Sequence, residues 1–202
     1  MRTILIILLI LTSSAFATIV VIQPGPAAGI DTTLKKQLPT MNFGDATGID
    51  IDGSSTLTQV FLLKFNLTSY SYATINSAYL HLYAFAGSGN GNLALNRVTS
   101  PWGEMVATWN NAPSYDSAAV TQPICPNFSW TIINITAIVQ YWVDHPGQNY
   151  GLRGRAQVTN VRRAFRSSDN NYNPYQSPKL VMEYGATPVE PISLGDIKAL
   201  FK

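Results

Sequence analysis

Hydrophobic and polar residues alternate most regularly between residues 75 and 86 (INSAYLHLYAFA). A period of two along a short segment is typical of a β-strand with one buried face. Leu80, Leu82 and Ala84 form the apolar set that we expect to face a core. The alternate residues should share the outer face of this strand: Tyr79, His81, Tyr83 and Phe85.

Other short segments are separated by residues that favour turns, such as the glycines and asparagines of 87–92 (GSGNGN). The stretch 102–113 (WGEMVATWNNAP) also alternates, because Met105, Ala107 and Trp109 fall on one side of an extended chain. We therefore expect strands in these ranges: 18–23, 58–66, 75–86, 93–98, 102–113, 128–134, 150–156, 161–166 and 179–184.

One internal helix interrupts the predicted strands. Thr136 can cap its N-terminus, and Pro146 and Gly147 follow its end. Val139 and Trp142 lie about one turn apart, on the side that should pack against the strands. Many short strands with a single helix predict an all-β fold, an antiparallel β-sandwich.

Both ends of the chain differ from this strand-rich part. Residues 1–17 combine Arg2, an apolar run too short to span a bilayer and a small-x-small motif (AFA), as in a secretory signal peptide. Residues 186–202 have the pattern of a linker followed by a short amphipathic helix. We expect one sandwich domain over 18–185, in a protein secreted to the extracellular space or the cell surface.

The charged residues are few and nearly balanced. They make up 12% of the chain, against roughly 25% in an average soluble domain, and the formal net charge is +2. This balance argues against nucleic acid or an anionic membrane as the main partner. The single cysteine, Cys125, cannot form an internal disulfide, so we expect a half-buried loop thiol or, alternatively, a bridge between chains.

The two tryptophans of 102–113 have two interpretations. They could form a platform for a sugar ring with Glu104 as a neighbouring acid, or they could anchor the fold. The alternation favours the second interpretation, with Trp109 in the core, Trp102 in the turn before it and Glu104 fixing a loop. Trp142 of the predicted helix is the other expected core anchor.

The order of motifs resembles one protein family. The motifs are NFGDATGIDIDG, FLLKFNLTS, NRVTSPWGEMVATWNNAP, SWTIINITAIVQYWVDHPGQNYGLRGR and FRSSDNNYNPYQSPKLVMEYG. In this order they resemble the DNRLRE, or disaggregatase-related, domain family, also described as carbohydrate-binding module family 96. The resemblance implies an extracellular jelly-roll-like sandwich that binds polysaccharide, including acidic polysaccharide such as alginate. Asn66 and Asn134 stand where the family usually has aspartates.

The sequence offers no clear catalytic arrangement. Glycoside hydrolysis usually needs two carboxyl groups, and no spacing selects a pair from Glu104, Asp116 and Asp144. The two histidines, His81 and His145, fit surface positions better than a catalytic triad, and no group of His and Cys has metal-site spacing. We therefore expect a non-enzymatic protein that needs no cofactor.

Two loops carry the oxygen donors that calcium prefers. Their donor residues are Asp45, Asp50 and Asp52 in the first loop and Asp169, Asn170 and Asn171 in the second. Neither loop has a fixed ligand spacing, and the turn-forming tendency of Asp and Asn also explains both. Calcium stays an alternative at this point.

Two groups of residues are candidates for binding polysaccharide. Tyr79, His81 and Tyr83 could stack against sugar rings. Guanidinium groups suit the carboxylates of acidic sugars, and the arginine-rich candidates are Arg153, Arg155, Arg163 and Arg166. Alternatively, the tyrosines pack under a loop and the arginines form a solvated rim.

Three Asn-x-Ser/Thr sequons make Asn66, Asn127 and Asn134 candidates for N-glycosylation. The whole chain also has a second interpretation, as an adhesin or filament subunit. Such a subunit would associate with itself through strand edges, Cys125 or the C-terminal helix.

Overall fold

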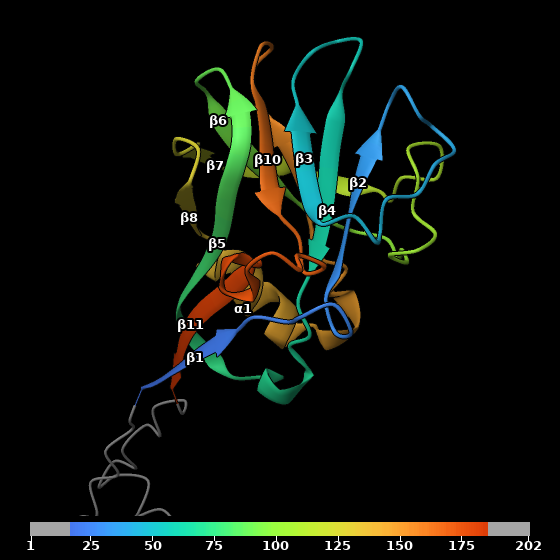
Figure 1. The fold of residues 1–202 in the computed structure, drawn as a ribbon. Coiled ribbons are helices and arrows are strands. Elements are labelled where there is room, and N and C mark those ends of the chain that lie inside the picture. The colour runs from blue at the N-terminus through green and yellow to red at the C-terminus, as the bar shows by residue number, and fades with distance from the viewer. Residues whose placement is uncertain (1–16, 186–202) are drawn as a thin grey trace, which may run out of the picture.

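The computed structural model describes residues 17–185, and Figure 1 shows how their strands and helices are arranged. The strands are β1 (Thr18–Ile22), β2 (Ile30–Lys35), β3 (Gly48–Asp52), β4 (Gln59–Lys64), β5 (Thr74–Ser88), β6 (Asn92–Val98), β7 (Tyr115–Pro123), β8 (Ser129–Asn134), β9 (Leu152–Ala156), β10 (Arg162–Arg166) and β11 (Lys179–Gly185). The helical segments are η1 (Thr68–Tyr70), α1 (Thr136–Asp144), η2 (Pro146–Gln148) and η3 (Pro174–Gln176).

The described segment ends before the predicted C-terminal helix, and the predicted signal peptide also lies outside it, apart from its last residue. Within residues 17–185, no helix is both long enough and apolar enough to cross a membrane.

The strands form two facing layers. Their order is β1-β11-β5-β10-β3-β4-β9-β6-β7, with β2 beside β4 and β8 beside β5, and the pairs are antiparallel. A single residue pair, Asp52 with Gln59, joins β3 to β4, so the sheet turns there from one layer into the other. We call β1, β11, β5, β10, β3 and β8 the first sheet, and β2, β4, β9, β6 and β7 the second sheet. This arrangement confirms the expected antiparallel, jelly-roll-like sandwich.

The interior lies between the two sheets. Leu80 and Leu82 of β5 are fully buried, as their alternation predicts. Phe61 of β4 and Phe165 of β10 meet edge to face across the interior, with 6.2 Å between ring centroids. A Cβ atom at Gly154 would lie 2.1 Å from the Phe61 ring, so a glycine lets β9 pass next to this ring.

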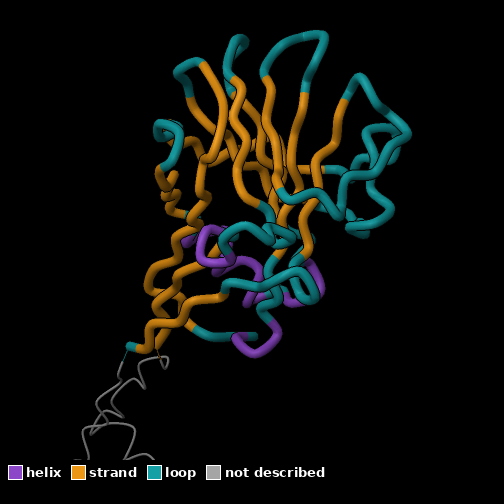
Figure 2. Tube along the Cα trace, in the orientation of Figure 1, coloured by secondary structure: helices purple, strands orange, loops and turns teal. Residues whose placement is uncertain are grey.

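Helix α1 covers one end of the interior, and Figure 2 shows the helical segments together in the lower part of the molecule. Trp142 is 1% exposed and packs in the main apolar cluster between the sheets. The expectation that Thr136 caps the helix is wrong. The side-chain oxygen of Asn134 accepts the hydrogen bond from the backbone N–H of Thr136 (3.0 Å), and the Thr136 hydroxyl accepts one from the backbone N–H of Ala78 (2.9 Å).

The expected strand over 102–113 is absent, and turns and bends replace it. Ala107 is buried but Trp109 is only half-buried, so the alternation does not define one buried face. The side-chain amide of Asn42 donates to the backbone carbonyls of Glu104 (2.6 Å) and Ala107 (2.8 Å). A side chain therefore satisfies carbonyl groups that a strand would present to a neighbouring strand.

Trp102 and Trp109 pack in a second apolar cluster on the outer face of the second sheet. The buried members of this cluster are Leu34, Val60, Leu62, Val98 and Ala107. Trp102 also donates its indole N–H to the backbone carbonyl of Tyr150 at 2.7 Å. The tryptophans therefore hold a loop onto the sheet, and Trp109 lies outside the sandwich interior.

Candidate functional site

The outer face of the first sheet carries a group of aromatic side chains, which we call the aromatic face (Tyr79, His81, Tyr83 and Trp130). Trp130 of β8 pairs with Tyr83 of β5, and its ring lies edge to face with Tyr83 (5.3 Å) and His81 (6.1 Å). The ammonium group of Lys179 lies 4.5 Å from the centroid of the Trp130 ring. Burial and the charge of Lys179 lower the pKa of His81, which favours its neutral imidazole.

Arg166 of β10 continues this face beyond β5. Its guanidinium lies 4.2 Å from the centroid of the Phe85 ring and 5.0 Å from that of Tyr172. These distances are typical of cation–π contacts. The guanidinium of Arg166 therefore packs against rings that a sugar would otherwise approach.

Arg163 faces the end of the sandwich interior and is 5% exposed. It donates to the backbone carbonyl of Gly89 (3.0 Å) and to the side-chain oxygen of Asn127. These bonds tie β10 to the turn after β5 and to the loop before β8. They also occupy the side chain of Asn127, whereas the sequon residues Asn66 and Asn134 are exposed.

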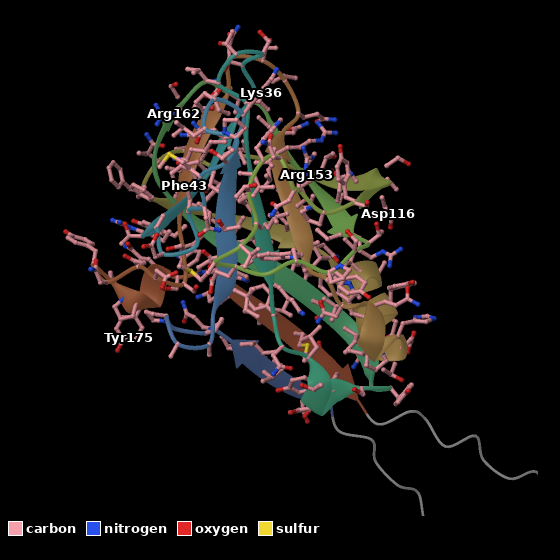
Figure 3. All side chains as sticks on the ribbon, turned by 90° about the vertical axis from the view of Figure 1, so that its right-hand side faces the viewer. Lys36, Phe43, Asp116, Arg153, Arg162 and Tyr175 are labelled. Atoms are coloured by element: carbon pink, nitrogen blue, oxygen red, sulfur yellow. The ribbon has the colours of Figure 1, made fainter. Side chains whose placement is uncertain are left out.

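Arg153 and Arg155 lie on β9, in the second sheet. Arg153 pairs with Leu62 of the outer apolar cluster, so both arginines face away from the sandwich interior. Figure 3 shows Arg153 and Arg162 toward opposite sides of the molecule, and Arg162 belongs to β10 of the first sheet. The predicted polysaccharide-binding residues are therefore divided between opposite faces of the sandwich.

A shallow groove of about 250 Å³ lies beside Arg153, lined by Leu34, Val60, Trp109, Ala112, Tyr115 and Arg153. The guanidinium carbon of Arg153 is 4.3 Å from the centroid of the Tyr115 ring. Its Nη1 atom is buried and has no hydrogen-bond partner within residues 17–185. Burial lowers the pKa of Arg153, but a guanidinium stays protonated at neutral pH. The groove is thus lined by a guanidinium that has one buried donor without an acceptor, next to an aromatic ring.

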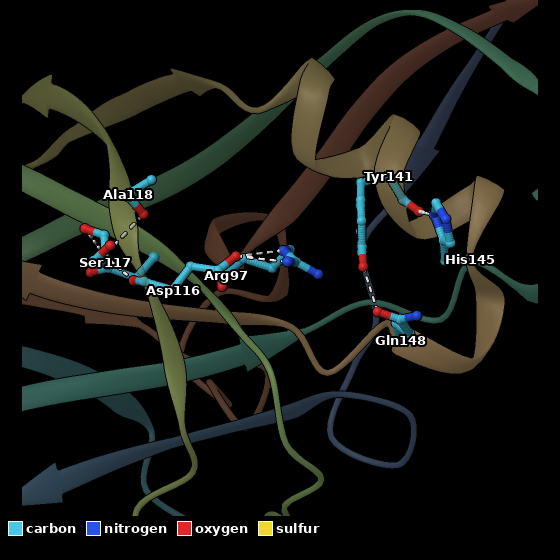
Figure 4. Close-up of polar contacts among 8 residues, drawn as sticks. Arg97, Asp116, Ser117, Ala118, Tyr141, His145 and Gln148 are labelled. Atoms are coloured by element: carbon cyan, nitrogen blue, oxygen red, sulfur yellow. Dashed lines mark hydrogen bonds and ion pairs between the residues drawn. The ribbon is translucent and has the colours of Figure 1, made fainter.

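Arg97, by contrast, has a carboxylate partner. Its Nη2 atom is 2.7 Å from Oδ2 of Asp116, and its guanidinium lies 3.8 Å from the centroid of the Tyr141 ring (Figure 4). Glu104 and Asp144, the other two carboxyl groups considered for catalysis, also accept hydrogen bonds from neighbouring groups. Each of the three carboxylates therefore has a separate local partner.

A different set of carboxyl groups does come together. One carboxylate oxygen each from Asp31, Glu104 and Asp169 lie within 4.8 Å of one another. Burial raises the pKa of Asp31 to about 7 and also raises the pKa values of Glu104 and Asp169. No aspartate of the first calcium candidate loop belongs to this set. Asp50 pairs with a lysine of β2, and Asp52 accepts a bond within its own turn.

The family model described as carbohydrate-binding module family 96 matches residues 26–184, which include β2 to β10 and nearly all of β11. This chain belongs to carbohydrate-binding module family 96. A comparison with curated proteins finds no match. Family 96 membership confirms the resemblance seen in the motifs, and it indicates a binding module with a polysaccharide partner.

Sequence reasoning misses several residues that form the two surfaces of this family 96 module. The alternation of Trp130 and Ile132 with the buried Thr131 is a signal that could have placed Trp130 on the outer face. The sequence around Tyr115 does not indicate its contact with Arg153. The two residues lie on β7 and β9, which are separated by β6 in the sheet. The partners of a family 96 surface residue can therefore come from strands distant in sequence.

Proposed function

We propose that this family 96 module binds an acidic polysaccharide in the groove beside Arg153. The observation that supports this best is the buried Nη1 atom of Arg153, which has no acceptor within the described residues. An unsatisfied buried donor costs about 1–3 kcal/mol, and more when it is charged. A sugar carboxylate in the groove would supply the missing acceptor once the side chains that cover Nη1 move aside. A uronate polymer offers one carboxylate on every sugar.

The neighbours of Arg153 suit the same ligand. Trp109 lines the groove together with Tyr115, whose ring lies under the guanidinium of Arg153. The ring of Trp109 can contact the C–H face of a sugar favourably. Arg155 lies two residues further along the same strand face and places a second positive charge beside the groove. A groove on a sheet face can accept an internal segment of a polymer, because it does not require a chain end.

The aromatic face is the second candidate surface, and we propose that it contributes less. Tyr79 is 38% exposed. His81 and Tyr83 are less accessible, because both rings are half-buried and pack edge to face with Trp130. The ammonium group of Lys179 lies over the Trp130 ring, as Arg166 does over Phe85. Stacking requires a free ring face, and these cations occupy part of it.

The proposal also includes the cellular location and the absence of catalysis. Removal of residues 1–17 as a signal peptide would release the module outside the cell, where its polysaccharide ligand would lie. The module would act by binding alone, as expected for its family. N-terminal sequencing of secreted protein tests the cleavage, because protein that still begins at Met1 would contradict it.

The binding proposal is tested by affinity electrophoresis through gels that contain alginate or pectate, with a neutral glucan gel for comparison. Arg153→Met keeps most of the side-chain volume and removes the charge. We expect retardation of the wild-type protein in the acidic gels and at least a tenfold weaker interaction for the variant, since a charged hydrogen bond is worth about 1.5–3 kcal/mol. Arg162→Met, at an exposed position of β10, is the matched control and should behave as wild type.

Two results would contradict this proposal. Unchanged retardation of the Arg153→Met protein would show that the groove is not the binding site. Retardation in the neutral gel alone would show that the ligand is not acidic. If Trp130→Ala abolished binding while Arg153→Met did not, the site would lie on the aromatic face.

A further inference from the structure

Three carboxyl groups from distant parts of the chain meet beside the edge strand β2. Asp31 lies on β2, Glu104 in the connection from β6 to β7, and Asp169 in the connection from β10 to β11. One oxygen from each lies within 4.8 Å of the other two. The ion pairs within residues 17–185 are Lys35 with Asp50 and Arg97 with Asp116, so no lysine or arginine of this part of the chain neutralises the three carboxylates.

The carboxyl group of Asp31 is the most deeply buried of the three, since Asp31 is 1% exposed. Its Oδ2 atom accepts a hydrogen bond from the backbone N–H of Ser168 at 2.8 Å. No donor within the described residues reaches its Oδ1 atom with hydrogen-bond geometry. The hydroxyl of Ser168, a residue that is 2% exposed, lies near enough to lower the pKa of Asp31 but also makes no hydrogen bond of normal geometry. Buried oxygen atoms without partners are uncommon in folded proteins and indicate that a ligand, an ion or water completes the site.

The local hydrogen bonds hold these groups in place without using all of their oxygen atoms. Oε1 of Glu104 accepts from the backbone N–H of Asp31 at 2.8 Å, which leaves Oε2 available. The backbone carbonyl of Glu104 accepts from the side chain of Asn42 at 2.6 Å, so the loop that carries Glu104 is fixed at this point. Gly44 packs against the same carbonyl, where an added Cβ atom would lie 2.6 Å from the oxygen.

We propose that Asp31, Glu104 and Asp169 bind a divalent cation, Ca²⁺, through the oxygen atoms left free by these hydrogen bonds. The donors are hard oxygen ligands, without nitrogen or sulfur, which suits calcium. Calcium–oxygen distances are about 2.3–2.6 Å, so two oxygen atoms bound to one ion lie no more than about 5 Å apart. The three carboxylate oxygens meet this condition, because they lie within 4.8 Å of one another.

A cation at this position would add to the hydrogen bonds that join three segments far apart in the sequence. It would hold the edge strand β2 to the loop of residues 99–114 and to the loop of residues 167–178. The site does not depend on the proposed polysaccharide ligand, because Asp31 and Asp169 lie outside the groove lining. Loss of polysaccharide binding and loss of cation binding can therefore be distinguished.

The test uses the full chain and Ca²⁺ itself. Isothermal titration calorimetry of chelator-treated protein should show one Ca²⁺ per chain. Thermal unfolding in 1 mM CaCl₂ should occur about 5 °C or more above unfolding in EDTA, as expected when the ion is in large excess over its Kd. An equal or larger effect of MgCl₂ would overturn the assignment of calcium.

Substitutions then locate the site. Glu104→Gln and Asp169→Asn keep the size of each side chain, and each should weaken Ca²⁺ binding at least tenfold. The control variant Asp144→Asn, at the exposed end of α1, should bind Ca²⁺ as the wild type does. Calorimetry of the wild-type protein decides the question even if a variant fails to fold. Absence of binding heat together with an unchanged melting temperature would overturn the proposal, and so would wild-type affinity in both site variants.

Discussion

Asp31→Asn replaces the most buried carboxyl group of residues 17–185 by a neutral group of the same shape. In calcium-free protein, burial raises the pKa of Asp31 from its ordinary value of 3.8 to about 7. A folded state with a raised acid pKa binds the proton more tightly than the unfolded state does. Protonated Asp31 therefore contributes to the unfolding free energy in full below about pH 4, and this contribution is lost as the pH rises toward 7.

The size of this effect follows from the two pKa values. A change from 3.8 to about 7 corresponds to about 4 kcal/mol of unfolding free energy across that pH range. The amide introduced by Asp31→Asn would not titrate, and it could donate to the neighbouring carboxylates of Glu104 and Asp169. We expect the Asp31→Asn protein in EDTA to match wild type near pH 4 and to exceed its stability by up to about 4 kcal/mol at pH 7.5.

Urea unfolding at several pH values between 4 and 7.5, with EDTA present, measures this difference. The wild-type protein should lose stability with rising pH more steeply than the variant. Addition of CaCl₂ at pH 7.5 should then stabilise the wild type and leave the variant nearly unchanged, because the ion requires the ionised carboxylate. Parallel pH profiles for the two proteins in EDTA would refute the reasoning about the burial of Asp31.

Three further predictions concern the core, Arg163 and self-association. Trp142→Ala should lower the unfolding free energy by about 3–5 kcal/mol in urea titrations. The control Tyr175→Ala, at a residue that is 81% exposed, should change it by less than about 0.5 kcal/mol. Equal effects of the two substitutions would contradict the assigned core. Arg163→Met should lower the unfolding free energy by about 1–3 kcal/mol, because two acceptors lose their donor. The variant should be retarded in alginate gels as the wild type is. Weaker retardation of a folded variant would show that Arg163 belongs to the binding site. The full-length protein and a protein without residues 186–202 should both elute as monomers in size-exclusion chromatography. Oligomers of the full-length protein that disappear on this deletion would favour a filament or adhesin subunit.

The residues that alternate most regularly are those whose structure the sequence predicts best. Strand β5 is an example, because Leu80 and Leu82 face the interior while Tyr79 and Tyr83 face outward. Three strands are missed for different physical reasons. Strand β2 (IDTTLK) contains a run of four buried residues, three of them polar, so apolar and polar residues do not alternate along it. Strand β3 (GIDID) has a sequence that resembles a loop. Strand β7 has no buried face, since backbone pairing with β6 at the sheet edge forms it.

The binding surfaces are less predictable than the strands. Local alternation places Arg153 and Arg155 on one strand face correctly, but it gives no information on which sheet the strand enters. The position of Asp31 beside Asp169 depends on pairing between segments far apart in the chain, so a sequence search by local spacing finds only Asp169. Long-range sheet topology therefore determines which charged residues meet.

Strand β1 has its partner at the far end of the chain, because Thr18 pairs with Tyr184 of β11. Strand β11 also supplies the hydrogen bonds along one edge of β5, from Thr74 to His81. Until residues 179–185 have been synthesised, β1 has no strand to join and that edge of β5 stays open. Such non-local pairing is slow to form and is completed late in folding. Ribosome-bound chains that stop before residue 179 should therefore remain sensitive to protease, and they should become resistant only once the last strand has emerged.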